Sequence, residues 1–346
     1  MIVADGGHHG RCKGLILDVA SGGGTSYSAA APRGGVRGDG LRLFGRTSGK
    51  QFRDPRGAPV TAAAPRTHTF EPTKFHRQFS GTIDPVLHIN SGDTVKTTTV
   101  DAGGTDFKGV RRSMGGNPET GPFYVEGAMP GGTLAVKFHR IRLNRDSAGS
   151  GDRIVPSALG PGYHCNAKYD DKFESEWKLD HESGLAMLKK PTDRLKNFKV
   201  KMQPMLGCVG VAPPARRAFR SGWLGSWGGN MDYNGLKEGV TVYLPVYQEG
   251  ALLFVGDGHA LEGDGELNGD ALETSMDVEF TVELIQGKST QGPRFENDEF
   301  IMASGIANSL QETTNCPRMR RPSCSEPLSA TTSRKWWIPR CTLSPK

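Results

Sequence analysis

One glycine-rich stretch of the chain, residues 256–273, gathers side chains that bind cations. It contains six acidic residues and one histidine: Asp257, His259, Glu262, Asp264, Glu266, Asp270 and Glu273. Their mutual repulsion would be costly unless a cation, a proton or a cationic substrate offset it. Carboxylates together with imidazole are the ligands that hard or borderline divalent metals select, and the glycines allow a tight backbone on which several ligands converge. The stretch therefore predicts a divalent-metal site, with zinc expected and calcium as the alternative.

Four residues are the predicted metal ligands. His259 is expected on a glycine-flanked turn at the end of a strand, where a side chain can point into a cleft; the alternative is a histidine hydrogen-bonded within the turn. Asp101 closes another strand, so it is expected either to converge on His259 or to serve as a simple turn aspartate. Asp257 and Asp264 adjoin glycines and are either ligands or caps of turns.

Two known ligand-binding motifs that this stretch resembles are excluded, and a cysteine nucleophile is disfavoured as the alternative to a metal site. Residues 258–263 have the spacing of a phosphate-binding loop, but acidic Asp264 follows where lysine would meet phosphate. The same aspartate opens a segment like an EF-hand calcium loop, but position twelve is Ser275 rather than glutamate. Cys208 is a candidate nucleophile, yet its apolar neighbours favour a buried core cysteine.

The elements that must position these residues are predicted to be strands. Apolar and polar residues alternate, or β-branched residues accumulate, at residues 86–89, 94–100, 123–125, 134–141, 241–247, 252–255 and 276–284. Glycine-rich turns separate these segments. The best helical signal is at residues 298–312, with Asp298 as the N-cap. The expected fold class is mainly β, a two-sheet β-sandwich-like body with few short helices.

Composition divides the chain into three parts. Residues 1–67 carry ten Lys and Arg against four Asp and Glu, and residues 313–346 carry seven against one, whereas residues 68–312 carry 26 against 32. Because the positive charge lies in the flanks and the body is acidic, no nucleic-acid partner is expected. The longest apolar runs are too short to span a membrane. The six cysteines include no CxxC pair, so neither a disulfide framework nor a structural zinc site is predicted.

Both flanks are predicted to lie outside the folded body. Residues 1–67 have little apolar periodicity and are expected to be disordered or to be a mis-annotated gene start. They lack an uninterrupted apolar signal-peptide core because Asp18 breaks it, so a cytoplasmic location is the default expectation, and secretion is the alternative if the start is wrong.

The C-terminal tail, residues 313–346, is basic, aperiodic and unlike a folded C-terminus. Back-translating residues 333–346 with suitable codons and dropping two nucleotides gives AEVVDPQVHVVAK, an alternating strand. Tryptophan has a single codon, so the adjacent Trp336 and Trp337 fix almost entirely the two neighbouring valines that the shifted reading frame encodes. We therefore predict that the tail is a frameshift product, which the nucleotide sequence of the gene can test.

Several motifs in sequence order resemble one known family. The stretches TGPFYVEGA (120–128), MLGCVGVAPP (205–214), GGNMD (228–232), LPVYQEGALLFVGDGHALEGDGEL (244–267) and ALE (271–273) are similar to those of the acetamidase/formamidase family. The resemblance covers about residues 68–312. It implies a β-sandwich-like fold, a homo-oligomer, metal dependence in at least some members, and hydrolysis of formamide or acetamide to ammonia and a carboxylate. The family usually extends past the position of Glu312, where the basic tail stands here.

Amide hydrolysis needs a nucleophile, a polarised carbonyl and a proton for the departing nitrogen. Glu266 and Glu273 are expected to complete the metal shell or act as general base, with solvated strand residues as the alternative. Glu126 is expected to enter the pocket, and Asn230 and Asp232 are expected to bind the substrate amide or the metal. The predicted function is hydrolysis of short-chain primary amides by a metal-activated water. The alternatives are a non-catalytic metal-binding β-sandwich and an inactive truncation of such an amidase.

Overall fold

The computed structural model describes residues 64–151, 174–263, 266, 269–306 and 340–342. All of them belong to one structural unit, residues 63–346. Nearly every described element is a strand, and the described helical structure is one 3-10 turn, η2 (Pro214–Arg216). No helix in this part of the chain has the length and apolar character needed to cross a membrane. The predicted β-rich fold class is therefore confirmed.

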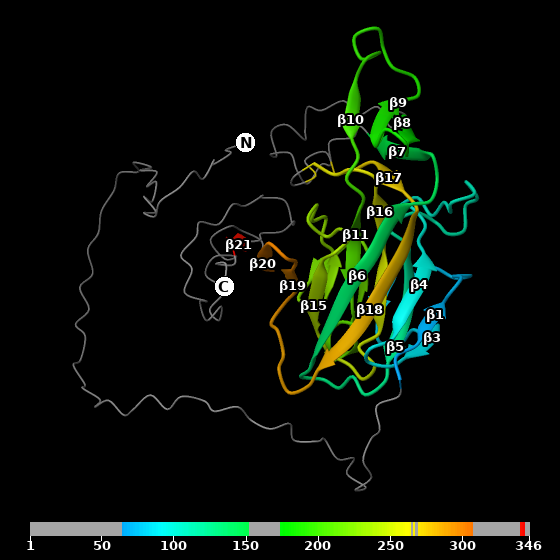
Figure 1. Cartoon of the computed structure of the whole chain (residues 1–346). Coiled ribbons are helices and arrows are strands. Elements are labelled where there is room, and N and C mark those ends of the chain that lie inside the picture. The colour runs from blue at the N-terminus through cyan, green and yellow to red at the C-terminus, as the bar shows by residue number, and fades with distance from the viewer. Residues whose placement is uncertain (1–63, 152–173, 264–265, 267–268, 307–339, 343–346) are drawn as a thin grey trace, which may run out of the picture. The chain divides into compact units, whose positions relative to one another are not determined.

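Two large sheets make up the described body (Figure 1). The first has the order β1 (Thr67–Thr69), β4 (Thr94–Thr98), β18 (Met276–Ile285), β6 (Thr133–Leu143), β15 (Thr241–Pro245), β19 (Arg294–Glu296), β20 (Phe300–Ala303) and β21 (Arg340–Thr342). The second has the order β10 (Lys199–Lys201), β9 (Leu185–Leu188), β8 (Glu174–Asp180), β7 (Ser147–Gly151), β17 (Glu273–Thr274), β16 (Leu253–His259), β11 (Met205–Gly210), β14 (Gly228–Asn230) and β13 (Leu224–Gly225). In the second sheet β5 (Glu119–Val125) also pairs with β16, and β3 (Leu87–Ile89) pairs with β5. A small third sheet joins β12 (Ala218–Arg220) to β2 (Gln78–Ser80).

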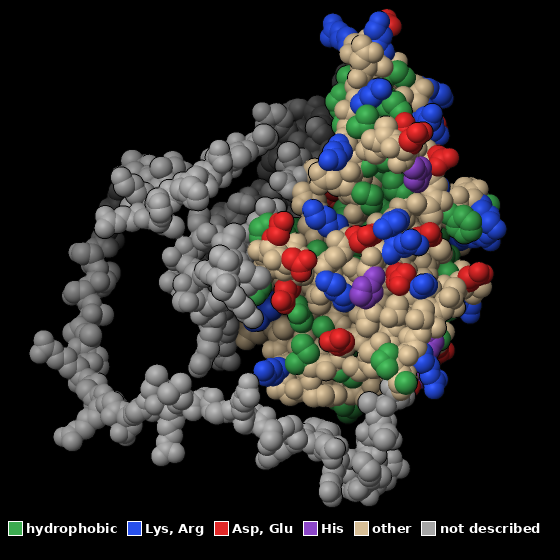
Figure 2. Space-filling model, in the orientation of Figure 1, with side chains coloured by type: hydrophobic (Ala, Val, Ile, Leu, Met, Phe, Trp, Pro, Cys, Tyr) green, Lys and Arg blue, Asp and Glu red, His purple; other side chains and the backbone are tan. Residues whose placement is uncertain are grey.

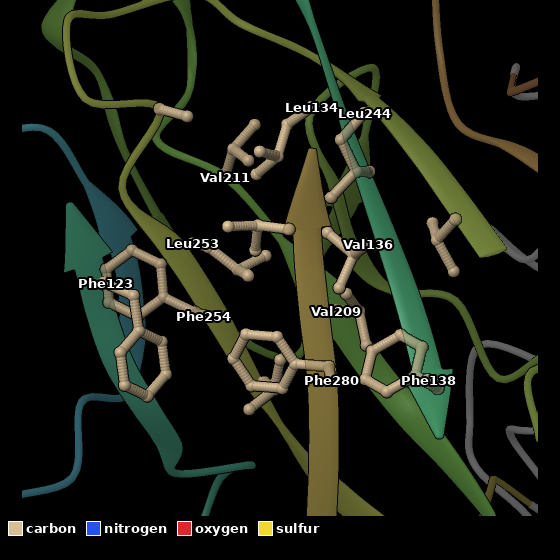
Figure 3. Close-up of a cluster of buried hydrophobic side chains, with 14 of the residues drawn as sticks. Phe123, Leu134, Val136, Phe138, Val209, Val211, Leu244, Leu253, Phe254 and Phe280 are labelled. Carbon is tan, nitrogen blue, oxygen red and sulfur yellow. The ribbon is translucent and has the colours of Figure 1, made fainter. Parts of the chain in front are cut away.

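The predicted alternation in β18 sets which of its faces is buried. Met276, Val278, Phe280 and Val282 are each at most 1% exposed, and the acidic residues between them lie on the other face. The rings of Phe280 and Phe123 from the opposite sheet lie 5.5 Å apart, and those of Phe280 and Phe138 lie 6.0 Å apart (Figure 3). Burying one such ring contributes about 1.5–3 kcal/mol, so this layer holds the two sheets together.

The outer face of the first sheet is polar and mixed in charge. Over β4, β18 and β6, Lys and Arg side chains are interspersed with Asp and Glu (Figure 2). One such pair joins Lys96 and Glu279 across neighbouring strands at 3.6 Å. Exposed pairs of this kind contribute little stability, but they keep the face soluble.

Two local predictions are wrong. Residues 300–303 form strand β20 rather than a helix, because Phe300 and Met302 turn inward while Ile301 between them is 41% exposed. Asp298 lies in the β19–β20 hairpin turn, where Oδ1 of Asn297 accepts hydrogen bonds from the next backbone amides. The segment from Gly256 to His259 continues β16 rather than forming a turn.

Glycines allow β16 to continue through this crowded region. A Cβ on Gly256 would lie 2.6 Å from Oε2 of Glu119, and a Cβ on Gly258 would lie 2.4 Å from Cγ of Met276. Side chains from neighbouring strands occupy the space above these two positions. The strand keeps its pairing because its glycines have no Cβ atoms that would collide with them. His259 is consequently held in the sheet interior rather than on a loop.

Candidate functional site

The last residues of β16 and the start of β17 bring a histidine and two acids together. The register pairs His259 with Glu273. His259 Nε2 lies 3.4 Å from Oδ1 of Asp257 and 3.3 Å from Oε1 of Glu273. Its other nitrogen, Nδ1, lies 3.0 Å from Oε2 of Glu262. The His259 side chain is 0% exposed, so these charges interact in an environment that contains little water.

A second set of acids shares the same histidine. Ligand atoms of Asp232, His259, Glu262 and Glu266 all lie within 4.8 Å of one another, and those of Asp257, His259 and Glu273 form a second group by the same measure. Asp232, Glu262 and Glu266 are each at most 8% exposed. We refer to the six residues of the two groups as the acidic cluster: Asp232, Asp257, His259, Glu262, Glu266 and Glu273.

Three acids of this cluster have unusual backbone conformations. The φ angles are 44° for Asp232, 57° for Asp257 and 40° for Glu266. Non-glycine residues in this left-handed region cost of the order of 1–3 kcal/mol each and concentrate at functional sites. The surrounding sheet therefore stabilises a strained backbone at the same positions that carry the carboxylates.

Gly207 of β11 leaves the space in which the cluster converges. A Cβ at this position would lie 2.6 Å from Oδ2 of Asp257, 2.8 Å from Oδ1 of Asp232 and 2.8 Å from Cε1 of His259. Its carbonyl oxygen accepts hydrogen bonds from the backbone amides of Met231 and Asp232, which fixes the entry of Asp232. The absence of a side chain here lets three functional groups approach one point.

Two asparagines tie the carboxylates to one another. Nδ2 of Asn117 donates to Oδ2 of Asp257 at 2.8 Å and to Oδ1 of Asn230 at 2.7 Å. Nδ2 of Asn230 in turn donates to Oδ2 of Asp232 at 2.6 Å. The sequence analysis did not identify Asn117 as a site residue, although it lies in a glycine-rich loop just before the motif at residues 120–128.

The charges of the cluster shift its titrations. Burial alone lowers the pKa of His259, but the carboxylates of Glu273, Asp257 and Glu262 raise it well above its ordinary value. Burial raises the pKa of Glu273 well above its ordinary value, and the charges of Asp257 and Asp270 raise it further while the nearby His259 lowers it. Burial also raises the pKa of Asp270, which accepts a hydrogen bond from the backbone amide of Gly151.

The donor set fits a divalent cation. Three atoms that face the cluster, Oδ1 of Asp257, Nε2 of His259 and Oε2 of Glu273, make no hydrogen bond within the described part of the chain. Buried polar atoms of this kind are normally satisfied, and a cation would satisfy them while offsetting the repulsion between carboxylates. One imidazole with several carboxylates suits zinc, and the oxygen-rich side of the set also suits calcium.

A further buried acid lies on the neighbouring row of the sheet. The register aligns Glu119 of β5, Gly256 of β16 and Cys208 of β11. Burial raises the pKa of Glu119 well above its ordinary value, the adjacent Cys208 thiol lowers it, and the charges of Asp257 and Asp232 raise it further. Sequence patterns gave no signal for Glu119, because an acid at the start of an apolar strand ordinarily faces solvent.

Cys208 occupies a core position. It is 0% exposed, and its Sγ donates to the carbonyl oxygen of Ser221 at 3.4 Å. Burial, together with the charges of Glu119 and Asp257, raises the pKa of the thiol well above its ordinary value. These properties favour the core-cysteine interpretation over the nucleophile.

Not every predicted site residue reaches the cluster. His259, Asp257, Glu266, Glu273 and Asp232 belong to it, and Asn230 contacts it through Asp232. Glu126 does not, because it follows β5 at the end opposite Glu119, about 23 Å along an extended strand; its half-exposed carboxylate pairs with Nδ1 of His88 at 2.7 Å.

Asp101 also falls outside both ligand groups. Its Oδ2 accepts a hydrogen bond from Nη2 of Arg145 at 2.6 Å, and its Oδ1 accepts one from the backbone amide of Thr105. The contacts of Asp101 are therefore those of a turn aspartate that also pairs with the largely buried Arg145. Asp264 lies outside the described residues.

A cavity lies elsewhere in the described body. It measures about 770 Å³ and is lined by residues that include Tyr124, Tyr247 and Leu252. Leu252 precedes β16, whereas His259 ends it, so the cavity and the cluster lie at opposite ends of this strand. The convergence of titratable groups, rather than cavity size, identifies the candidate site.

The fold and the cluster together define a two-sheet β protein with a carboxylate-rich cluster around a buried histidine. A model of the Acetamidase/Formamidase family matches residues 215–310, which contain all six residues of the cluster. An acetamidase of Mycolicibacterium smegmatis is 41% identical over 61 residues. That alignment covers 17% of this chain and 15% of the relative, so it spans only a small part of that protein.

Solved structures extend the match across the described body. A recombinant protein described as a predicted acetamidase/formamidase from the thermophile Thermoanaerobacter tengcongensis is 28% identical with a TM-score of 0.60, covering 72% of this chain and 80% of that one. An acetamidase from Yersinia enterocolitica is 29% identical with a TM-score of 0.60, covering 73% and 78%. These comparisons agree on one family: the chain is similar to the acetamidase/formamidase family in sequence over residues 215–310 and in fold over the described body.

Proposed function

We propose that this protein hydrolyses short-chain primary amides, formamide or acetamide, to ammonia and a carboxylate. The observation that carries the proposal is the convergence of the buried His259 with five carboxylates, of which those of Asp257 and Asp232 lie with it around the side-chain-free position of Gly207. Similarity to the acetamidase/formamidase family supports amide hydrolysis as the reaction class.

The cation site is part of the proposal. His259, Asp257 and Asp232 would hold the ion, with zinc expected first because an imidazole is present and calcium as the alternative. A bound divalent cation would polarise the substrate carbonyl and acidify the attacking water.

The remaining groups have roles that follow from their positions. The carboxylate of Glu273 lies 3.3 Å from Nε2 of His259, so it can accept the proton of the attacking water and return it to the departing nitrogen. Glu266, whose carboxylate lies within 4.8 Å of a ring nitrogen of His259, is the alternative for the same role. Asn117 orients Asp257 through its side-chain amide. Burial of the cluster excludes bulk water, which strengthens each of these interactions.

Ammonia release from formamide and acetamide by the purified full-length protein tests the proposal. The protein is stripped with a chelator, and Zn²⁺ or Ca²⁺ is then added back separately. Turnover that disappears with chelator and returns with one of the two ions is the expected result. Cation-dependent rise of the melting temperature without turnover of either amide would instead favour a non-catalytic cation-binding protein.

Matched histidine variants test the site within the same assay. His259→Gln should lose amide turnover by at least roughly a hundredfold, as expected when a ligand or general acid–base group is removed. His139→Gln replaces a histidine whose ring bonds Thr281 on the exposed face and should behave as wild type. Full activity in folded His259→Gln would refute the assignment.

A further inference from the structure

Arg145 and Asp101 form an ion pair that is almost withdrawn from water. Their side chains are 10% and 11% exposed, and Nη2 of Arg145 lies 2.6 Å from Oδ2 of Asp101. Arg145 stands between β6 and β7, more than forty residues from its partner in sequence. A pair held in this way differs from the exposed ion pairs of the outer face, because each partner depends on the other for compensation of its charge.

The other donors of the same guanidinium bind three further segments. Nε donates to the carbonyl oxygen of Ser147 at 2.9 Å, and Nη1 donates to that of Thr105 at 3.3 Å. Nη2 also donates to the carbonyl oxygen of Glu273 at 3.2 Å. Only the planar fork of arginine can satisfy so many acceptors at once; the ammonium of lysine cannot.

Both ends of this network reach the acidic cluster. On one side, the guanidinium holds the backbone of Glu273, whose Oε1 lies 3.3 Å from His259 Nε2. On the other side, Ala102 follows Asp101, and its carbonyl oxygen accepts the backbone amides of Gly116 and Asn117. Asn117 then bonds Asp257. The pair therefore joins the segments that deliver Glu273 and Asp257 to the site.

The charge balance of the pair also bears on the cluster. A guanidinium so close to Glu273 would repel a cation at the cluster if its charge were uncompensated. Asp101 supplies that compensation. This explains why an aspartate near the site is bound to arginine rather than placed among the ligands.

We propose that Arg145 and Asp101 are positioning residues of the acidic cluster: the guanidinium fork fixes Glu273 and the loop that carries Asn117, and Asp101 neutralises the guanidinium so that a divalent cation can bind. This inference rests on the proposed function for its catalytic consequence, but its consequence for cation binding is independent of any amide substrate.

Zn²⁺ titration of the chelator-stripped full-length protein by calorimetry separates charge from general structure. Asp101→Asn should weaken Zn²⁺ binding by roughly three- to thirtyfold, because one uncompensated positive charge is left beside the site. Arg145→Met should weaken it less than Asp101→Asn does, because it removes a positive charge instead of leaving one uncompensated. The double variant, which restores the net charge, should bind Zn²⁺ more tightly than Asp101→Asn alone, whereas a merely structural pair predicts a double variant at least as weak.

Amide turnover then tests the role of the fork. Arg145→Lys retains the charge but not the geometry, so it should keep Zn²⁺ affinity and lose kcat by roughly tenfold or more with little change in KM. Arg112→Met is the matched control: it breaks an ion pair of the same 2.6 Å length to Asp106 in the same loop, but Arg112 is 49% exposed. It should leave both measurements unchanged.

Two results would overturn the inference: a double variant no better at binding Zn²⁺ than Asp101→Asn, or Arg145→Lys with wild-type kcat. If wild type hydrolyses neither amide, the proposed function fails, and the Zn²⁺ titrations alone decide the positioning role. Melting curves identify any variant that does not fold; Arg145→Lys, the mildest change, then carries the test through its kcat, which should fall although its Zn²⁺ affinity equals that of wild type.

Discussion

Replacing Gly207 with alanine tests whether the side chains around it act as one site. The added Cβ would lie 2.6 Å from Oδ2 of Asp257 and 2.8 Å from both Oδ1 of Asp232 and Cε1 of His259. Ordinary contacts begin at 3.4 Å, so the methyl group must displace the first atom by about 0.8 Å and the other two by about 0.6 Å. Gly207 is not among the glycines with positive φ, so the methyl group acts through these contacts rather than through backbone strain.

The expected effects follow from these displacements. Overpacking a well-filled interior costs about 1–3 kcal/mol, which a domain with about 5–15 kcal/mol of stability survives. A misplacement approaching 1 Å at a reacting centre costs about a hundredfold in rate. Gly207→Ala should therefore fold, melt at a lower temperature, bind Zn²⁺ more weakly and lose kcat/KM on formamide by roughly ten- to hundredfold.

The assay combines ammonia release, Zn²⁺ titration and thermal unfolding on the same preparation. Gly222→Ala is the control, because a Cβ at Gly222 meets no atom within 4 Å and its φ is also unremarkable. The control should match wild type in all three measurements. A folded Gly207→Ala protein with wild-type turnover and Zn²⁺ affinity would show that the groups around Gly207 are not the functional site.

Two further predictions concern stability. The pKa of Glu119 is raised above its ordinary value of 4.5 chiefly by burial, so its contribution to stability is fully present below about pH 4.5 and is lost as pH rises through the folded-state pKa. Glu119→Gln should accordingly gain stability relative to wild type as the pH rises above about 4.5 in denaturant titrations, and a pH-independent difference would contradict this. Phe280→Ala should lower the free energy of unfolding by about 3–5 kcal/mol, because Phe280 is 0% exposed and its ring contacts both sheets. A loss below about 1 kcal/mol would show that this aromatic layer does not hold the sheets together.

Periodicity predicted the strands that have one buried and one polar face. In β18 the alternation from Met276 to Leu284 is read directly from the letters, because a residue's face follows from its position in the strand. The same reasoning failed at residues 298–312, where Phe300 and Met302 fit either a helix or an edge strand. Pairing with β19 decided between them, and that pairing involves residues outside the segment.

Chemistry predicted the centre of the site but not its surroundings. His259, Asp257 and Glu273 stand out because cation-binding side chains are crowded into a short glycine-rich stretch. Glu126 and Asp101 are also acidic residues. Glu126 lies at the far end of β5 and pairs with His88, and Asp101 forms an ion pair with Arg145. Residue type alone does not distinguish a ligand from a partner in an ion pair.

The sequence by itself determined that this chain folds as a β-rich body and that residues 256–273 concentrate its cation-binding groups, because both properties depend on local alternation and local composition. The tertiary structure alone decided that Gly207 provides the space for convergence, that Asn117 joins the site, and that Glu119 is buried beside Cys208. Those facts depend on the register between strands far apart in sequence. A one-residue change in that register would turn the side chains to opposite faces, and no local pattern in the chain specifies it.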